Sequence, residues 1–219
     1  MTIISIKDVS KSFKGNVLFE NINLDIRKGQ IYGFVGPNGS GKSVLFKMIC
    51  GFIFPDSGEI SIDGLEIGKD KRFPENFGVI IDRPGYIASK TGFENLKELA
   101  MIRGNISDKE VVETMEMVGL DAQSSQKTKN YSLGMKQKLA ICQAIMEKQE
   151  VLVLDEPFNA LDVDSVKKVR DLLLRFKEEG RTILLTSHNQ DDIKICDEVY
   201  RINRSKLELT LPLIGDSHS

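Results

Sequence analysis

The chain has 219 residues, of which 41% are hydrophobic and 28% are charged, and its formal net charge at pH 7 is -2. This balance is typical of a globular protein and argues against a disordered chain or a strongly basic nucleic-acid-binding protein. The length suits one sizeable α/β domain, or a core with a small attached subdomain, and we expect no second independent unit.

The first eight residues lack the basic, apolar and small-residue regions of a signal peptide, and no apolar run approaches the length of a membrane span. We therefore expect the chain to stay in the cytosol. Cys50, Cys142 and Cys196 are widely spaced, and the sequence has few histidines that could complete a metal site with them. This pattern favours buried, reduced thiols.

The N-terminal segment predicts strands over residues 3–9, 17–26 and 30–35, separated by polar, glycine-containing turns. Phe13 ends the first of these strands beside a turn, where an aromatic face can stay open. We predict that adenine stacks on Phe13, because base stacking on an aromatic ring contributes about 1 to 3 kcal/mol and tolerates many bases. Core packing of the ring is the alternative.

Residues 36–43 match the phosphate-loop pattern G-x-x-x-x-G-K-[ST], after the apolar run 31–35 and before a helix predicted over 42–50. Glycines turn backbone N–H groups inward around a phosphate, and the helix N-terminus favours the same anion. Lys42 is predicted to reach the β- and γ-phosphates, and Ser43 to offer its hydroxyl to Mg²⁺. A glycine-rich turn that merely joins a strand to a helix is the alternative. The predicted nucleotide-binding residues here are Gly36, Pro37, Asn38, Gly39, Ser40, Gly41, Lys42, Ser43 and Val44.

Short strands are predicted over 59–62 and 77–81, followed by a loop at 82–86 that contains proline and glycine. From residue 91 to residue 147 the pattern becomes helical. Two capping boxes, Thr91 with Glu94 and Ser107 with Glu110, precede apolar residues at helical spacing, and a further helix is predicted over 133–147 after a polar linker at 121–129. The span predicts a helical insert between strands of the core.

Residues 151–156 read Val-Leu-Val-Leu-Asp-Glu, an apolar run that ends in two adjacent acids. A continuous apolar strand is typical of a parallel sheet, in which both faces are buried. Open α/β sheets bind ligands at the carboxyl ends of their strands, where the phosphate loop also lies. We therefore predict that Asp155 holds Mg²⁺ through water and that Glu156 orients or polarises the attacking water. The alternative is that the two acids begin an exposed loop.

A helix is predicted over 165–179, and an apolar strand over 182–185 leads through Thr186 and Ser187 to His188. A lone histidine is usually structural or exposed. His188, however, follows a core strand at the same edge as the acids, which favours a contact with the γ-phosphate. A helix over 190–196 and a strand over 198–202 complete the predicted core.

The stretch that distinguishes between classes of phosphate-loop protein is Tyr-Ser-Leu-Gly-Met-Lys-Gln at residues 131–137. With it, the motifs resemble the ATP-binding cassette family, specifically the ATPase subunit of an ABC transporter, over nearly the whole chain. The resemblance implies ATP and Mg²⁺ as cofactors, and Lys42, Glu156 and His188 as catalytic residues. It also assigns Phe13 to the adenine-stacking aromatic, 36–43 to Walker A, 151–156 to Walker B, 159–162 to the D-loop and His188 to the switch histidine.

Residues 131–137 occupy the position of the family's Leu-Ser-Gly-Gly-Gln signature, which contacts the γ-phosphate held by a second cassette. Ser132 and Gly134 are carried over to that contact, whereas Leu133 and Met135 depart from the family pattern. A helix start suits this contact because its dipole favours a phosphate. The resemblance implies a head-to-tail dimer with ATP shared between two copies of this chain, or between this chain and a related cassette.

The family usually has a glutamine in its Q-loop, where this chain has Asp82. An acid can bind Mg²⁺ or its water, so the predicted metal ligands are Ser43, Asp82 and Asp155. Aspartate is shorter than glutamine and adds negative charge beside the two acids of the Walker B strand. An acid here, together with Ser-Leu-Gly-Met-Lys-Gln, resembles the bacitracin and lantibiotic resistance or immunity exporter subgroup.

The expected fold is α/β: a P-loop NTPase core, with a mainly parallel sheet flanked by helices, an N-terminal antiparallel β subdomain and a helical insert. We expect a single nucleotide-binding domain over 1–219, with its core at about 1–85 and 150–205. The helical subdomain is expected at about 86–149 and a polar C-terminal tail at about 206–219.

The resemblance implies an ATP-hydrolysing subunit that couples cassette dimerisation to transport, in the direction of export, by separate membrane-spanning permease subunits. It would lie in the cytoplasm, peripheral on the inner face of the cell membrane, with docking at the helical insert and at residues 82–90, and without nucleic acid. One alternative is a soluble ABC ATPase acting on ribosomes or DNA, but such proteins generally carry two cassettes or a long coiled-coil insertion. Another is a binding module without turnover, against which Lys42, Asp155, Glu156 and His188 argue.

Overall fold

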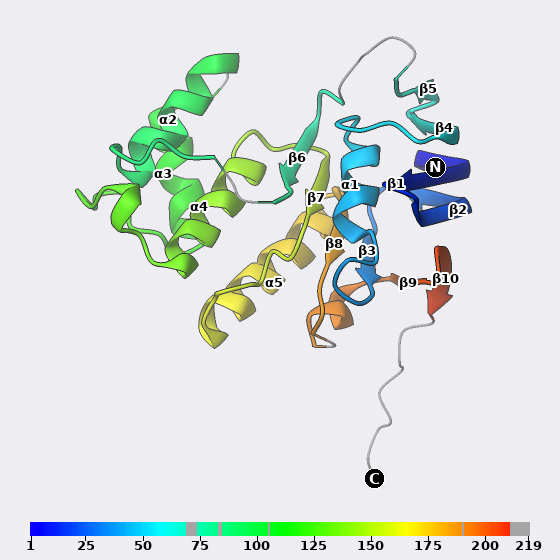
Figure 1. Cartoon of the computed structure of the whole chain (residues 1–219). Coiled ribbons are helices and arrows are strands. Elements are labelled where there is room, and N and C mark those ends of the chain that lie inside the picture. Colours follow the sequence, from blue (N-terminus) through cyan, green and yellow to red (C-terminus); the bar gives the residue numbers. More distant parts are fainter. Residues whose placement is uncertain (69–73, 83–84, 105, 190, 211–219) are drawn as a thin grey trace.

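The computed structural model describes residues 1–68, 74–82, 85–104, 106–189 and 191–210. Figure 1 shows their arrangement. The strands are β1 Thr2–Phe13, β2 Asn16–Arg27, β3 Ile31–Val35, β4 Ser57–Ile62, β5 Leu65–Glu66, β6 Phe77–Ile80, β7 Val151–Leu154, β8 Thr182–Thr186, β9 Glu198–Asn203 and β10 Lys206–Thr210. The helices are α1 Lys42–Ile49, α2 Gly92–Arg103, α3 Asp108–Met117, α4 Leu133–Ile145 and α5 Val163–Glu178, with 3-10 turns η1 Thr128–Asn130 and η2 Asp192–Ile195.

The central sheet has the strand order β10-β9-β3-β8-β7-β6. All of its pairings are parallel except that of β10 with β9, so the predicted, mainly parallel core is confirmed. Every residue of β7 is buried. Because successive side chains of a strand point to opposite faces, Val151 and Val153 pack in one hydrophobic core, while Leu152 and Leu154 pack in the other.

Two layers cover the faces of this sheet. On one face, α1 packs together with β1 and β2 of an antiparallel sheet whose order is β2-β1-β4-β5. On the other face, α4 and α5 pack against the sheet, and α2 and α3 continue the same core into the helical insert. Figure 1 shows α2, α3 and α4 together at one end of the molecule and the antiparallel strands at the other.

The helical insert begins as its local sequence predicts. Thr91 and Ser107 each accept a hydrogen bond from the backbone of the glutamate three residues later, and each glutamate bonds back, so both capping boxes form. The segment 121–129, predicted as a linker, ends within η1. An unpredicted contact closes the start of α2: the Tyr131 hydroxyl accepts a hydrogen bond from Gly92 N at 3.1 Å.

Two predictions about the C-terminal part are corrected by the structure. The expected helix over 190–196 is reduced to the four-residue turn η2, with residue 190 outside the described residues. There the buried Asp192 bonds Ser187 and Arg170, contacts made across the fold and not along a helix. The expected polar tail from residue 206 begins instead as β10, which pairs with β9 over its full length. Residues 211–219 of that tail lie outside the described residues.

The cysteines are free and buried, as predicted. Burial raises the pKa of Cys50 and of Cys196 to about 12, and it raises the pKa of Cys142 further. Their thiols are therefore protonated at neutral pH and poorly nucleophilic. Within the described residues, no helix combines the length and the apolar character needed to cross a membrane.

The tightest backbone approach in the core lies at Gly78 of β6, where a Cβ atom would stand 1.8 Å from the carbonyl oxygen of Ala144. Gly78→Ala must push α4 away from the sheet, so we expect the free energy of unfolding to fall by about 3 kcal/mol or more. Urea unfolding followed by circular dichroism measures this change. Gly85→Ala is the matched control, because nothing lies within 4 Å of its Cβ position. Equal stability of the two variants would contradict the packing described here.

Candidate nucleotide site

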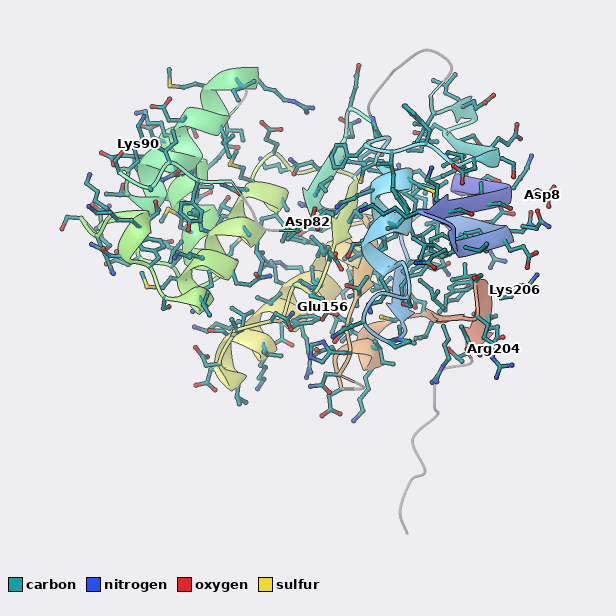
Figure 2. All side chains as sticks on the ribbon, viewed as in Figure 1. Asp8, Asp82, Lys90, Glu156, Arg204 and Lys206 are labelled. Atoms are coloured by element: carbon teal, nitrogen blue, oxygen red, sulfur yellow. The ribbon has the colours of Figure 1, made fainter. Side chains whose placement is uncertain are left out.

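The residues predicted to bind nucleotide meet at one edge of the central sheet. The carboxyl ends of β3, β8, β7 and β6 lie at this edge because these strands are parallel neighbours. The phosphate loop follows β3, Asp155 follows β7, and Asp82 follows β6. Figure 2 shows Asp82 and Glu156 between the helical insert, marked by Lys90, and the antiparallel sheet, marked by Asp8.

The phosphate loop needs glycine at the position before α1. Gly41 has φ of 105°, and a Cβ atom there would come within 2.8 Å of the Phe19 ring. Gly41 also caps α1 without a side-chain hydrogen bond, so no side chain of the cap competes for the helix N-terminus. The hydroxyl oxygen of Ser40 is buried without a hydrogen-bond partner among the described residues. A cradle of backbone with an unsatisfied hydroxyl fits a phosphate ligand.

Lys42 folds back into this loop. Its Nζ donates hydrogen bonds to the carbonyl oxygens of Gly36 at 2.8 Å and Pro37 at 3.2 Å, and only 7% of the residue is exposed. A buried ammonium costs free energy unless it is hydrogen-bonded, and these carbonyls supply the bonds. The lysine ammonium is therefore held inside the loop. There it can exchange its hydrogen bonds to the carbonyls for hydrogen bonds to phosphate oxygens.

Asp155 joins the loop to the sheet through both of its carboxylate oxygens. Ser43 Oγ donates to Oδ2 at 2.5 Å, and Thr186 Oγ1, at the end of β8, donates to Oδ1 at 2.6 Å. The predicted magnesium ligands Ser43 and Asp155 are thus in direct contact. Hydroxyl and carboxylate oxygens are the donors that Mg²⁺ prefers, so this pair fits the ion.

The structure brings Glu156 and His188 together, as the sequence predicted for residues at one edge. Glu156 Oε2 lies 2.9 Å from His188 Nδ1. Glu156 has φ of 51°, in the left-handed region that costs a non-glycine residue about 1 to 2 kcal/mol. Its backbone N–H donates to Thr186 Oγ1 at 2.8 Å, which fixes this conformation. Strained residues held in this way cluster at functional sites.

The signature residues lie at the start of α4. Ser132 is the N-cap and accepts a hydrogen bond from Met135 N at 3.1 Å. A Cβ atom on Gly134 would lie 2.8 Å from Ala160 O, so the signature and the D-loop of the same chain touch. Among the described residues, no hydrogen bond joins Ser132 or Gly134 to the phosphate loop of the same chain. The side chain of Leu133 between them is exposed.

Within the described residues, no hydrogen bond joins Asp82 to the Ser43–Asp155 pair. Its carboxylate forms an ion pair with Lys47 of α1, at 2.6 Å, and its φ is 60°. In the part of the chain that is described, no three His, Cys, Asp or Glu residues are grouped to hold a metal. The structure thus joins two of the three predicted metal ligands and directs the third toward a lysine.

Phe13 keeps an open ring at the end of β1. The residue is 43% exposed, and Lys11 Nζ lies 5.1 Å from the ring centroid. Core packing of this residue, the alternative considered above, is therefore excluded. A cavity of about 280 Å³ lies beside the phosphate loop, lined by Val17, Leu18 and residues 37–40 and 202–205. Val17 belongs to the same β1–β2 hairpin as Phe13.

Sequence reasoning missed three residues that organise the site: Thr186, Gln137 and Lys47. The Gln137 side chain, on α4, donates to the carbonyl oxygens of Pro157 at 3.0 Å and Glu156 at 3.3 Å. The available signal was positional, because Thr186 ends a buried strand as Asp155 does. Gln137 and Lys47 carry no such signal, because they lie within helices and not at the end of a buried strand.

Thr186 is fully buried and serves both Asp155 and Glu156, so Thr186→Val leaves a carboxylate oxygen and a backbone N–H unpaired. We expect the free energy of unfolding to fall by about 2 kcal/mol, since unsatisfied buried groups cost about 1 to 3 kcal/mol each. Denaturant titration provides the measurement. Thr186→Ser, which keeps the hydroxyl, is the control, and a larger loss in this variant than in Thr186→Val would refute the argument.

Comparison with known proteins agrees with this geometry. The Uncharacterized ABC transporter ATP-binding protein YybJ of Bacillus subtilis is 40% identical over 97% of this chain and 98% of its own length. The Bacitracin transport ATP-binding protein BcrA of Bacillus licheniformis is 36% identical over 96% of this chain and 70% of its own length.

The fold matches that of the ATP-binding cassette MJ0796, solved as a dimer in a post-hydrolysis state with ADP and Pi, with a TM-score of 0.87. That match has 23% identity and covers 96% of this chain and 99% of the other. The model of a family described as ABC transporter matches residues 19–159. The resemblance expected from the motifs is confirmed, and the chain belongs to the ABC transporter family, as one of its ATP-binding cassettes.

Proposed function

We propose that this chain is the ATP-hydrolysing subunit of an ABC exporter, which couples ATP-driven pairing of two cassettes to movement of separate membrane subunits. One observation carries the proposal: a continuous hydrogen-bonded path from Ser43 through Asp155 and Thr186 to the backbone of Glu156. This path fixes the phosphate loop and the two acids relative to one another. Positioning together with electrostatic stabilisation provides most of the catalysis in phosphoryl transfer.

The roles we propose follow from these contacts. Lys42 and the backbone N–H groups of residues 38–44 bind the phosphates, while the open ring of Phe13 stacks on adenine. Ser43 and Asp155 hold Mg²⁺, which when bound supplies positive charge to the phosphate oxygens. Glu156 orients the attacking water, and His188 exchanges its bond with Glu156 for one to the γ-phosphate. A metal role for Asp82 stays a prediction.

Glu156→Gln removes the carboxylate charge and keeps the shape of the side chain. We expect ATP binding to persist and phosphate release to fall at least about 100-fold, the usual contribution of a positioned acid or base. Cassette dimers should then accumulate with ATP. Phosphate release and analytical ultracentrifugation measure the two effects.

Glu150→Gln is the control, because this acid precedes β7 at the opposite end of the strand and pairs with Lys28. It should retain the turnover of the unmodified protein. Unchanged turnover in Glu156→Gln would reject the catalytic role, and failure of the unmodified protein to hydrolyse ATP would reject the proposed function.

The second cassette completes the site in this proposal. Ser132 caps α4 with its N-terminus open to an anion, and the neighbouring Leu133 is 74% exposed. Val163, which begins α5 after the D-loop, is 85% exposed. Exposed apolar side chains beside an anion-binding helix start support a facing subunit that brings its own nucleotide. The similar cassette MJ0796 was also solved as a dimer.

Ser132→Asp separates capping from nucleotide contact, because aspartate caps helices as well as serine does. We expect unchanged thermal stability but little ATP-dependent dimer, since a carboxylate would oppose the γ-phosphate. Ser132→Asn, of equal size and without charge, should retain more dimer. Sedimentation of both variants in the Glu156→Gln background tests this expectation, and equal dimer in the two would contradict it.

The relatives support our proposal of membrane partners. A bacitracin transport ATP-binding protein is among the similar chains, which favours transport over the soluble alternative acting on ribosomes or DNA. The exposed Ile87 and Met101 of the helical insert provide apolar surface for a permease. We therefore propose that the chain works at the cytoplasmic face of the membrane, attached through its insert and the segment that precedes it.

A further inference from the structure

One face of α1 contacts two neighbouring strand ends. Ser43 and Lys47 are four residues apart, so their side chains share a face of the helix. Ser43 bonds Asp155 after β7, and Lys47 bonds Asp82 after β6, with 2.6 Å between Lys47 Nζ and Asp82 Oδ2. The two strand ends are directly connected, because Asp155 N donates to Ile80 O at 2.7 Å. Lys47 therefore binds the acid that follows β6, just as Ser43 binds the acid that follows β7.

Negative charge accumulates along this edge. Asp82, Asp155 and Glu156 all lie there, and an arriving triphosphate adds more. The partners of Asp155 are hydroxyl groups, which supply hydrogen bonds without a net charge. The ammonium of Lys42 is engaged by loop carbonyls. Lys47 is the cation that the structure pairs with Asp82.

The Lys47–Asp82 ion pair contributes little to folding stability, but it affects the binding of an anion at this edge. The Lys47 and Asp82 side chains are 30% and 61% exposed, and ion pairs this exposed contribute little to stability. A bound nucleotide displaces water from the edge, which strengthens every remaining charge interaction. An unpaired Asp82 would then repel the triphosphate, whereas the ion pair turns its carboxylate toward Lys47.

We propose that Lys47 is a positioning residue for nucleotide binding, which neutralises Asp82 and holds its carboxylate away from the phosphate loop. The ion pair lets an acid occupy this strand end without weakening the affinity for ATP. This inference rests on the proposed nucleotide site. It adds to that site a residue outside the phosphate loop and the Walker B strand.

A double-mutant cycle tests the proposal. The chain contains no tryptophan, so binding of the β,γ-imido analogue of ATP is measured by calorimetry, with Mg²⁺ and with EDTA. Lys47→Met should raise the Kd about fivefold, which corresponds to about 1 kcal/mol. In the Asp82→Asn background the same change should raise the Kd less than twofold. Lys47→Arg, which keeps the charge, should bind more tightly than Lys47→Met.

Lys177→Met is the matched control. Lys177 is 32% exposed, close to the 30% of Lys47, and pairs with Asp197 at 2.5 Å, but Asp197 bonds Ile31 at the opposite end of β3. This variant should keep the Kd of the unmodified protein, and circular dichroism checks the folding of every variant.

Three results would overturn the inference. The first is no loss of nucleotide affinity in Lys47→Met, and the second is an equal loss from this change in the unmodified and Asp82→Asn backgrounds. The third is a loss of affinity in the single variant Asp82→Asn that is seen with Mg²⁺ and not with EDTA. The last would make Asp82 a metal ligand. If the unmodified protein bound no nucleotide, the proposed function itself would fail, which separates the two conclusions.

Discussion

The carboxylate of Asp155 is the interaction on which this edge of the molecule depends. It accepts hydrogen bonds from Ser43 at the start of α1 and from Thr186 at the end of β8. The backbone of the same residue donates to the end of β6. One side chain thus ties the phosphate loop to the sheet. This is possible because the carboxyl ends of parallel strands lie at the same edge of the sheet, so groups distant in sequence lie close together there.

The helical insert is coupled to this edge by a small set of contacts. Gln137 of α4 donates to the carbonyl oxygens of Glu156 and Pro157, and Gln143 donates to Gly85 O at 3.1 Å. Gly134 approaches the backbone of Ala160. The backbone at Glu156 and Pro157 is therefore hydrogen-bonded directly to the helix whose N-cap is Ser132. Because ligands shift conformations through differential contacts, these bonds offer a route from nucleotide to insert.

The local patterns gave correct predictions where a short stretch decides its own conformation. The strand, loop and helix around residues 36–43 form as expected, and so do both capping boxes. The prediction of η2 as a longer helix and of residue 206 onward as a tail was wrong. In both places distant contacts decide: Asp192 bonds Arg170 and Ser187, and β10 takes its hydrogen bonds from β9.

The sequence by itself determined the family, through motifs that resemble it. It also determined the core strands, the helical insert and the phosphate loop, since these depend on local spacing and apolar periodicity. Only the tertiary structure decided that Thr186 holds both acids, that Gln137 reaches Glu156 and that Asp82 faces Lys47. The reason is physical: each of these contacts joins a side chain of one strand or helix to a residue just past the end of another strand. Their distance is set by sheet order and helix packing, which no local pattern encodes.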